Sequence, residues 1–175
     1  MTKVKISHLV KPLKTSFLVF FLCFLISLFI LIWIFNSYLN EKDLNTKASD
    51  SGKVEILNTS LPTKVLNVEI ADEKEEWTRG YSFRKGFDDF DGMFFIFPDS
   101  KKRYFHMKDV LFPLDIIFIN EKGLVVNLER NLPSCFEEDC PIYESEGNAK
   151  YVLEIPGGFA EKYGIDEGVE VRMIF

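Results

Sequence analysis

Residues 114–128, LDIIFINEKGLVVNL, decide the fold, because they read as two short strands joined by a tight turn. The apolar runs Leu114–Ile119 and Leu124–Leu128 have the length and the branched and aromatic content of β-strands. Between them, Asn120-Glu121-Lys122-Gly123 is a turn sequence in which Gly123 can adopt a positive φ. The stretch therefore predicts an antiparallel β-hairpin.

Further short apolar runs, separated by turn residues, lie on both sides of this hairpin. They are Val54–Leu57, Val65–Ile70, Met93–Phe97, Tyr104–Lys108, Tyr151–Ile155 and Val169–Ile174. Together with the hairpin they give eight candidate strands, which predict a mainly β domain built as an antiparallel sandwich or barrel. Two short helices are expected, over Asp72–Arg84 and Gly158–Tyr163, the second ended by Gly164.

The segment Phe17–Phe35 is apolar enough to cross a membrane. It contains no charge and no proline, and at the helical rise it reaches about 28 Å, close to the thickness of a bilayer core. A cleaved signal peptide is the alternative, but its apolar region is shorter and ends in small residues. Here the run continues into Trp33-Ile34-Phe35-Asn36-Ser37-Tyr38, which favours an uncleaved signal anchor.

The charges on either side of this segment predict its orientation. Lysines alone precede it, at positions 3, 5, 11 and 14, and Glu41 and Asp43 follow it. The positive-inside rule then keeps the N-terminus in the cytoplasm and places the rest in the periplasm or outside the cell. The expected organisation is a cytoplasmic tail (1–15), a transmembrane anchor (16–38), a polar tether (39–53) and one outer domain (54–175).

Composition limits the partners of the outer domain. The chain of 175 residues has a net charge of -6, and because the tail is basic the outer part is more acidic than that. Such a surface argues against nucleic acid and against anionic headgroups as its main partners.

Cys135 and Cys140 are expected to form a disulfide, since they flank a short polar loop in a part of the chain that is exported. A zinc site would need further ligands, and of the two histidines His8 lies on the other side of the membrane. A redox-active pair is disfavoured by the spacing and by three acids between the thiols. Cys23 lies within the apolar segment, where it behaves as a small apolar residue.

Several motifs, in their order along the chain, resemble a widespread prokaryotic family, domain of unknown function 192 (DUF192). They are Arg79-Gly80, Phe83-Arg84, Gly92–Pro98, Phe105–Lys108, Pro113–Ile119, Tyr151–Gly158 and Glu161–Ile165. The resemblance covers roughly Val65 to Ile174 and implies a compact β-sandwich of jelly-roll type. It implies no activity, because the family has no settled biochemical role.

Two departures from the family pattern bear on function. Tyr81-Ser82 stands where the family typically has Leu-Met, and His106 stands where it has Trp. The second change puts in doubt any function that needs a large aromatic platform at that position.

Asp115 is an acid within an apolar strand. Alternation places it beside Ile117 and Ile119, so it should be buried and should need a partner. Arg79, Arg84 and Lys108 are the candidate cations. A structural ion pair or hydrogen bonds at the strand end are favoured over a catalytic acid, because paired buried charges are often structural.

The strand around His106 sends Tyr104, His106 and Lys108 to one face. That face is either ordinary solvated surface or a ligand-contacting surface. Bases outnumber acids from Arg79 to Lys108, seven to four, so a fold that gathers these bases could hold a carboxylate or phosphate. A scattered arrangement is the alternative.

No motif for a nucleophile, a metal, a phosphate loop or a cofactor is present in the sequence, so no catalytic residue is assigned. The leading hypothesis is a membrane-anchored binding module for a small anionic or glycan-like envelope ligand, or for an envelope protein. Its expected ligand face comprises Arg79, Arg84, His106, Lys108 and Asp115. The alternatives are an envelope enzyme with Asp115 or His106 as acid or base, and a structural component of a membrane complex.

Overall fold

The computed structural model describes residues 13–44, 50–57 and 61–174. It divides into two compact units, Met1–Ala48 and Ser49–Phe175, which are described separately. The expected cytoplasmic tail therefore lies almost wholly outside the described residues, as do residues 45–49 of the expected tether.

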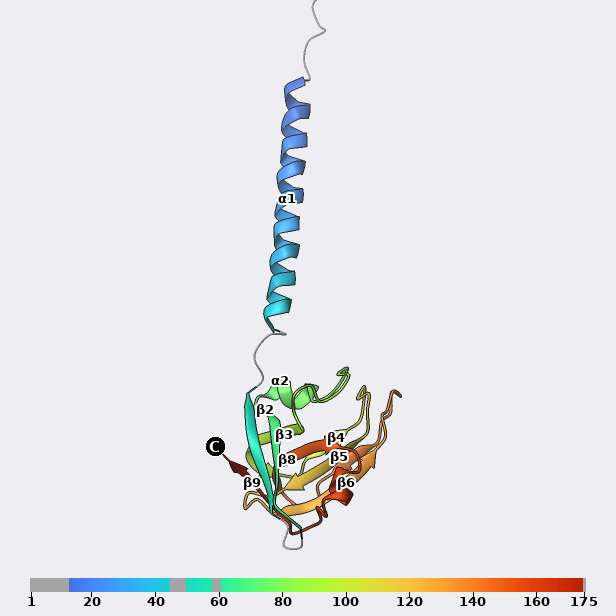
Figure 1. The fold of residues 1–175 in the computed structure, drawn as a ribbon. Helices are drawn as coiled ribbons and strands as arrows, with labels where there is room; N and C mark the ends of the chain where they lie inside the picture. Colours follow the sequence, from blue (N-terminus) through green and yellow to red (C-terminus); the bar gives the residue numbers. More distant parts are fainter. Residues whose placement is uncertain (1–12, 45–49, 58–60, 175) are drawn as a thin grey trace, which may run out of the picture. The chain divides into compact units, whose positions relative to one another are not determined.

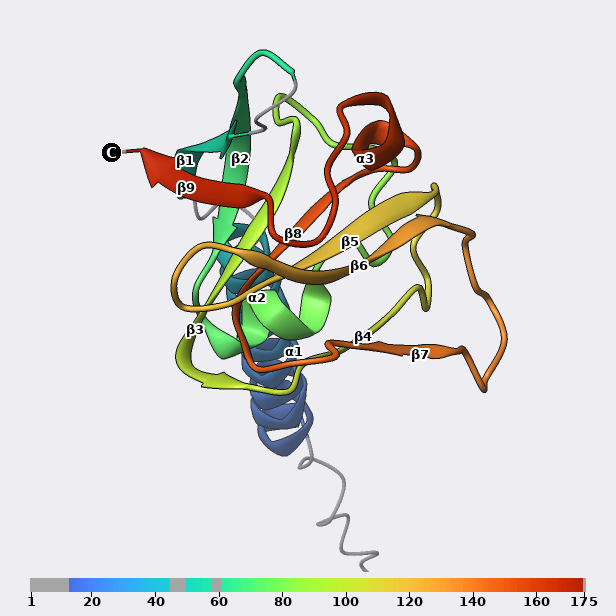
Figure 2. The same ribbon diagram turned by 90° about the horizontal axis from the view of Figure 1, so that it is seen from below.

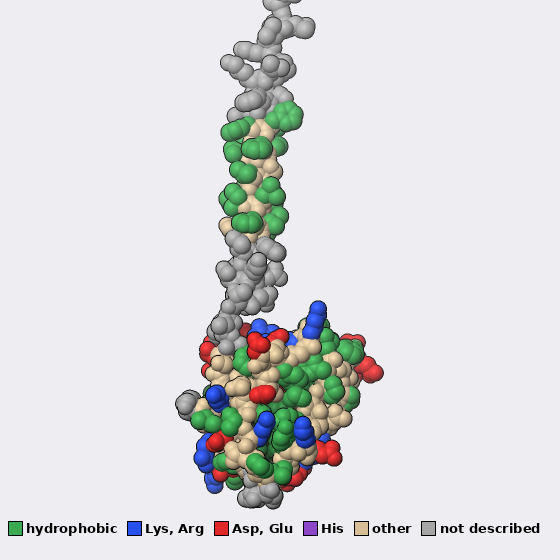
Figure 3. Space-filling view, viewed as in Figure 1, with side chains coloured by type: hydrophobic (Ala, Val, Ile, Leu, Met, Phe, Trp, Pro, Cys, Tyr) green, Lys and Arg blue, Asp and Glu red, His purple; other side chains and the backbone are tan. Residues whose placement is uncertain are grey.

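The first unit is the helix α1, Leu13–Leu44, whose apolar part Val19–Ser37 is long enough to cross a membrane. Hydrophobic side chains surround the coloured part of this helix, with no acidic or basic side chain among them (Figure 3). A helix that is apolar on all sides is typical of a membrane span or of a signal sequence. By length and composition α1 thus fits a signal anchor or a signal sequence.

The second unit is mainly β, as the sequence predicts (Figure 1). Its strands are β1 (Ser51–Leu57), β2 (Lys64–Ala71), β3 (Gly92–Lys101), β4 (Tyr104–His106), β5 (Leu114–Ile119), β6 (Val125–Leu132), β7 (Ile142–Glu144), β8 (Ala149–Pro156) and β9 (Glu170–Ile174). Two short helices, α2 (Lys74–Arg79) and α3 (Phe159–Lys162), complete it. Seven strands form one sheet in the order β6-β5-β8-β3-β2-β1-β9, and β4 pairs with β7 in a second, two-stranded sheet.

The large sheet curls into a half-barrel, with its two edge strands joined at one end. Leu124, just before β6, bridges Glu170 of β9, and the Val125 amide donates to the carbonyl of Val169 at 2.9 Å. Irregular register in β3 and in the β5–β6 hairpin bends the strands, since bulges increase local twist. The predicted hairpin is confirmed, with Gly123 at φ 80° in its turn.

The sheet differs from the expected antiparallel sandwich or barrel in two respects. β2 and β3 run parallel, because the segment 72–91, which contains α2, carries the chain back to the other end of the sheet. The two sheets are also unequal, seven strands against two, so the second is a small cover rather than a matching layer. Strand β7, only three residues long, was not among the expected strands.

The large sheet is buried on both faces, so the domain has two hydrophobic clusters. Ile117 and Ile119 join the cluster inside the curl, which α3 covers, whereas Leu114, Ile116 and Phe118 join the other. Figure 2 shows α3 on one side of the sheet and α2 with β4 and β7 on the opposite side. The predicted alternation along β5 is confirmed, and double burial explains why its apolar run is continuous.

Candidate ligand-binding site

A cavity of about 380 Å³ opens on the face of the sheet that α2 and β4 cover. Its lining comes from α2 and the following turn, from β3, from the segment Lys102–His106, from Val110, and from one residue of β8. Small-molecule sites have volumes of roughly 300–1,000 Å³, so this cavity suits a small ligand. Its walls are aromatic, formed by Trp77, Phe95, Phe97, Tyr104 and Phe105.

Two polar side chains at the floor of the cavity lack hydrogen-bond partners. Among the described residues, Glu154 Oε2 and Tyr81 Oη are the buried side-chain atoms that have no hydrogen-bond partner. The two residues are only 5% and 1% exposed, so bulk water does not replace the missing partners. A buried polar group without a partner costs stability, and native proteins contain few of them. This pair is therefore the feature of the cavity most in need of a functional explanation.

Glu154 is held in its neutral form. Burial raises the pKa of its carboxyl group to about 8, from an ordinary value of 4.5. Burial, and then the nearby Glu154, also raise the pKa of the Tyr81 hydroxyl. At neutral pH the floor thus presents two O–H groups, one from a carboxylic acid and one from a phenol.

The turn after α2 brings Tyr81 into the cavity lining with Glu154. Gly80 ends the helix with φ 46°, and a Cβ there would lie 3.8 Å from Glu154 Oε2. The indole of Trp77 donates to the carbonyl of Ala71 at 3.0 Å, which fastens the helix to the end of β2. A left-handed residue at this point lets the chain turn down onto the sheet, so Tyr81 enters the core.

Basic side chains stand at the rim of the cavity. Lys74, Arg79 and Lys102 are exposed, and the Arg79 guanidinium has no ion pair or hydrogen bond to the described residues. Lys102 Nζ lies 3.8 Å from Glu144 Oε1, and this long, exposed ion pair holds Lys102 only weakly. Arg103 differs from them, because it bonds Asp99 and the carbonyl of Ala149 and lies 3.9 Å from the Phe97 ring.

The structure brings together two of the five expected ligand residues, Arg79 and His106, which both line the cavity. Arg84 instead forms a bidentate pair with Glu69 of β2. Lys108 bridges Cys135 through its backbone, outside the lining.

Asp115 is fully buried beside α3 and accepts hydrogen bonds from three backbone amides. They belong to Asn131, Gly158 and Ala160, at 2.6, 2.9 and 2.6 Å. Both carboxylate oxygens thus accept hydrogen bonds at the end of the strand, which is the structural role expected for Asp115. Among the described residues, no cation forms an ion pair with Asp115. Asp115 fastens β6 and the start of α3 to β5.

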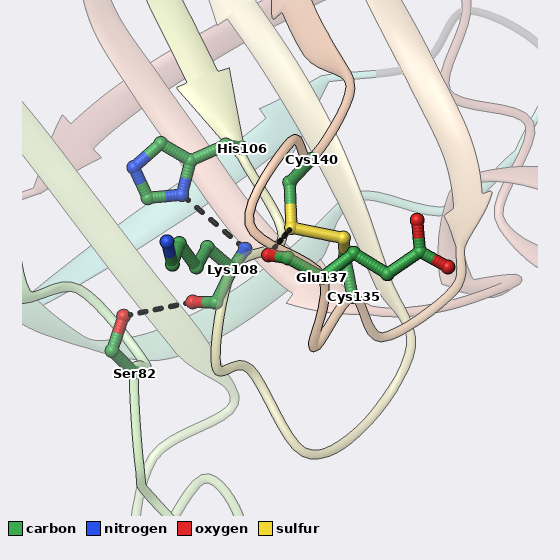
Figure 4. Close-up of a disulfide and its surroundings, with 6 residues drawn as sticks. All are labelled: Ser82, His106, Lys108, Cys135, Glu137 and Cys140. Carbon is green, nitrogen blue, oxygen red and sulfur yellow. Dashed lines mark hydrogen bonds between the residues drawn. A yellow bond between two sulfur atoms is a disulfide. The ribbon is translucent and has the colours of Figure 1, made fainter.

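The Cys135–Cys140 disulfide is formed, with a Cα–Cα distance of 6.0 Å. Figure 4 shows it beside the segment that carries His106 and Lys108. The Lys108 amide donates to His106 Nδ1 at 3.3 Å, and the Ser82 hydroxyl to the Lys108 carbonyl at 3.2 Å. Closing so short a ring stabilises a fold by about 2 kcal/mol in the loop-closure account. The cross-link therefore supports one border of the cavity.

Glu154 and Tyr81 were not expected as site residues. The sequence carries a signal for Glu154, since it is the one acid in the apolar run Tyr151–Ile155, as Asp115 is in its own. Tyr81 carries a weaker signal, since Tyr81-Ser82 departs from the family pattern, but an aromatic residue within an expected helix is ordinary core.

Comparisons with known proteins agree on the kind of domain. Residues 56–173 match the family DUF192, described as "Uncharacterized ACR". A crystal structure from Novosphingobium aromaticivorans, of a protein of unknown function, is 30% identical, with a TM-score of 0.66 over 73% of this chain and 88% of that one. One from Sinorhizobium meliloti, described as a "putative transcription regulator", is 26% identical, with a TM-score of 0.66 over 71% and 95%. No curated protein matches the chain.

Proposed function

The chain belongs to the DUF192 family, and from this premise we propose that its outer domain is a membrane-anchored, extracytoplasmic module that binds a small anionic ligand in the cavity. The observation that carries the proposal is the cavity itself, with two polar atoms at its floor that bond to no described residue and with cations at its rim. A protein rarely keeps buried polar groups without hydrogen-bond partners unless a ligand supplies those partners. Arg79 and Lys102 would hold the anion, and the aromatic walls the rest of the ligand.

The two alternatives have less support. A purely structural component needs no cavity with converging cations, so the cavity counts against it. Of the two residues expected in an enzyme, Asp115 has its oxygens occupied by three backbone amides, which leaves His106. Among the described residues, no hydrogen bond joins His106 to a Ser, Thr or Cys side chain, as an activated nucleophile would need.

Removing a rim cation is expected to weaken ligand binding. A thermal-shift screen of the full chain against carboxylate and phosphate metabolites should find a stabilising anion, since a ligand at a hundred times its dissociation constant adds about 2.7 kcal/mol. Arg79→Ala and Lys102→Ala should each raise the dissociation constant of that anion about tenfold, the loss of one charge-assisted contact. Lys122→Ala, exposed in the β5–β6 turn, is the matched control and should bind as the parent does. A flat response to every anion would contradict the proposal.

The topology can be tested by counting thiols. Under denaturing conditions after acid quenching, a polyethylene glycol maleimide should add to the full chain once, at Cys23, because the anchor is retained and Cys135–Cys140 is oxidised. A chain without residues 1–38 should stay in the cytoplasm, lack the disulfide and add two. Cys135→Ser in the full chain is the control and should add two, at Cys23 and Cys140. No adduct on the full chain would show that the helix is cleaved off, and three would show that the domain is not exported.

A further inference from the structure

Resting on the proposed function, we infer that the cavity binds one acidic sugar ring, with ring hydroxyls on the floor beside Glu154 and Tyr81 and the acidic substituent at the rim beside Arg79 and Lys102. The chemical groups differ between the floor of the cavity, where Glu154 and Tyr81 lie, and its rim, where Arg79 and Lys102 lie, and this order sets the ligand class and its orientation.

The floor selects an uncharged hydroxyl. Glu154 Oε2 and Tyr81 Oη are both buried and both free to bond, and a hydroxyl can accept from one O–H while donating to the other group. A cationic ligand is opposed by Lys74, Arg79 and Lys102 at the mouth. An anion on the floor would have to lie beside the carboxyl group of Glu154. The basic side chains at the rim are better partners for it.

The walls and the volume suit a single ring with apolar faces. Phe95 and Phe105 meet edge to face, with centroids 5.1 Å apart, and Trp77 and Phe97 lie 4.9 Å apart. A sugar presents C–H groups on its ring faces and hydroxyls at its edges, so it can pack against these rings while its edge reaches the floor. The volume of about 380 Å³ is at the lower end for ligand sites, which leaves room for one unit rather than a chain.

The binding should be coupled to a proton on Glu154. The charged and titratable groups that line the cavity with Glu154 are Lys74, Arg79, Tyr81, Lys102, Arg103, Tyr104 and His106. Tyr81 is in turn close to Glu69, Arg84 and Asp88. Arg84 and Arg103 are committed to Glu69 and Asp99. With the pKa of Glu154 raised to about 8, the acid loses its donor only in mildly alkaline solution. Affinity should therefore fall as the pH rises through that region.

The experiment measures quenching of Trp77, which lines the cavity, in full chain carrying Trp33→Phe. The protein is held in a detergent without a sugar headgroup. The probes are glucuronate, galacturonate and glucose 6-phosphate, each beside its neutral parent sugar, with acetate and inorganic phosphate as bare anions. At least one acidic sugar is expected to bind tenfold or more tightly than both its parent and the bare anion at pH 7, and to weaken about tenfold by pH 9.

Three variants separate the floor from the rim. Tyr81→Phe keeps the ring and should weaken the sugars about tenfold without affecting the bare anions. Glu154→Gln resembles the neutral acid, so it should keep binding and abolish its pH dependence. Arg79→Ala should weaken the acidic sugars and the bare anions but not the neutral sugars.

The outcomes distinguish this inference from the proposed function. If bare anions bind as tightly as acidic sugars and Tyr81→Phe has no effect, the sugar assignment is overturned while anion binding stands. If Glu154→Gln abolishes binding at pH 7, the carboxylate rather than the acid makes the contact, and the inferred floor is wrong. If no probe and no anion binds, both proposals fail.

Discussion

Glu154→Gln is expected to raise the free energy of unfolding by about 5 kcal/mol at pH 9 and to change it little at pH 4. In the unfolded chain this carboxyl group loses its proton near pH 4.5, whereas in the folded domain its pKa is raised to about 8 by burial. The unfolded state therefore binds fewer protons throughout that window, so the parent loses stability as the pH rises from about 4.5 to about 8. Below that window the protonated Glu154 makes its full contribution to the free energy of unfolding. Glutamine does not titrate, so the variant lacks this pH dependence altogether.

The measurement is urea unfolding of the full chain in detergent from pH 4 to 9, followed by Trp77 fluorescence in the Trp33→Phe background. The informative quantity is the difference between variant and parent, because other groups titrate equally in both. Glu121→Gln, an exposed acid in the hairpin turn, is the control and should track the parent at every pH. A difference that does not grow with pH would mean that Glu154 is ionised in the folded domain.

Asp115→Ala is expected to lower the free energy of unfolding by about 5 kcal/mol, among the largest effects of any single change in the domain. The substitution leaves three buried amides without an acceptor, and each charge-assisted bond contributes roughly 1.5–3 kcal/mol. Such a loss is comparable to the whole stability of a small domain.

Asp115→Asn refines this test, because the amide oxygen of asparagine can still accept some of the three hydrogen bonds. It should cost about half as much as alanine in urea unfolding at pH 7. Asp166→Ala, an exposed acid paired with Arg130, is the matched control and should cost under about 1 kcal/mol. If Asp115→Ala lowers the free energy of unfolding no more than this control does, the three hydrogen bonds do not hold the strand end. A catalytic role for Asp115 would then be favoured over a structural one.

The sequence predicts the strands well because burial leaves a direct mark on composition. The β5–β6 hairpin is confirmed nearly in full, since its apolar runs and Gly123 specify local structure. β7 was missed because three residues leave no periodicity to detect. The parallel β2–β3 pair was missed because strand direction depends on the path of the connection, although a segment as long as 72–91 is itself a sign of a crossover.

The candidate site was predicted only in part, for a related reason. Arg79 and His106 stand out in the sequence as polar residues beside apolar runs, and both reach the cavity. Arg84 and Lys108 stand out equally, yet one is paired with Glu69 and the other turns its backbone to the disulfide loop. Which charges converge is decided by contacts between distant segments, and these contacts also bring Tyr81, which was not expected as a site residue, into the lining with Glu154.

The position of β9 constrains how the chain can be made. β1, the first strand after the helix, pairs on one side with β2 and on the other with β9, which follows it far along the chain. The outermost ladder of the sheet therefore cannot form until β9 has been synthesised, and the same holds for the corner at Glu170 that joins the two edges. A chain that stops before β9 would be released as a globule with an open seam, exposed to proteases and to pairing with another chain.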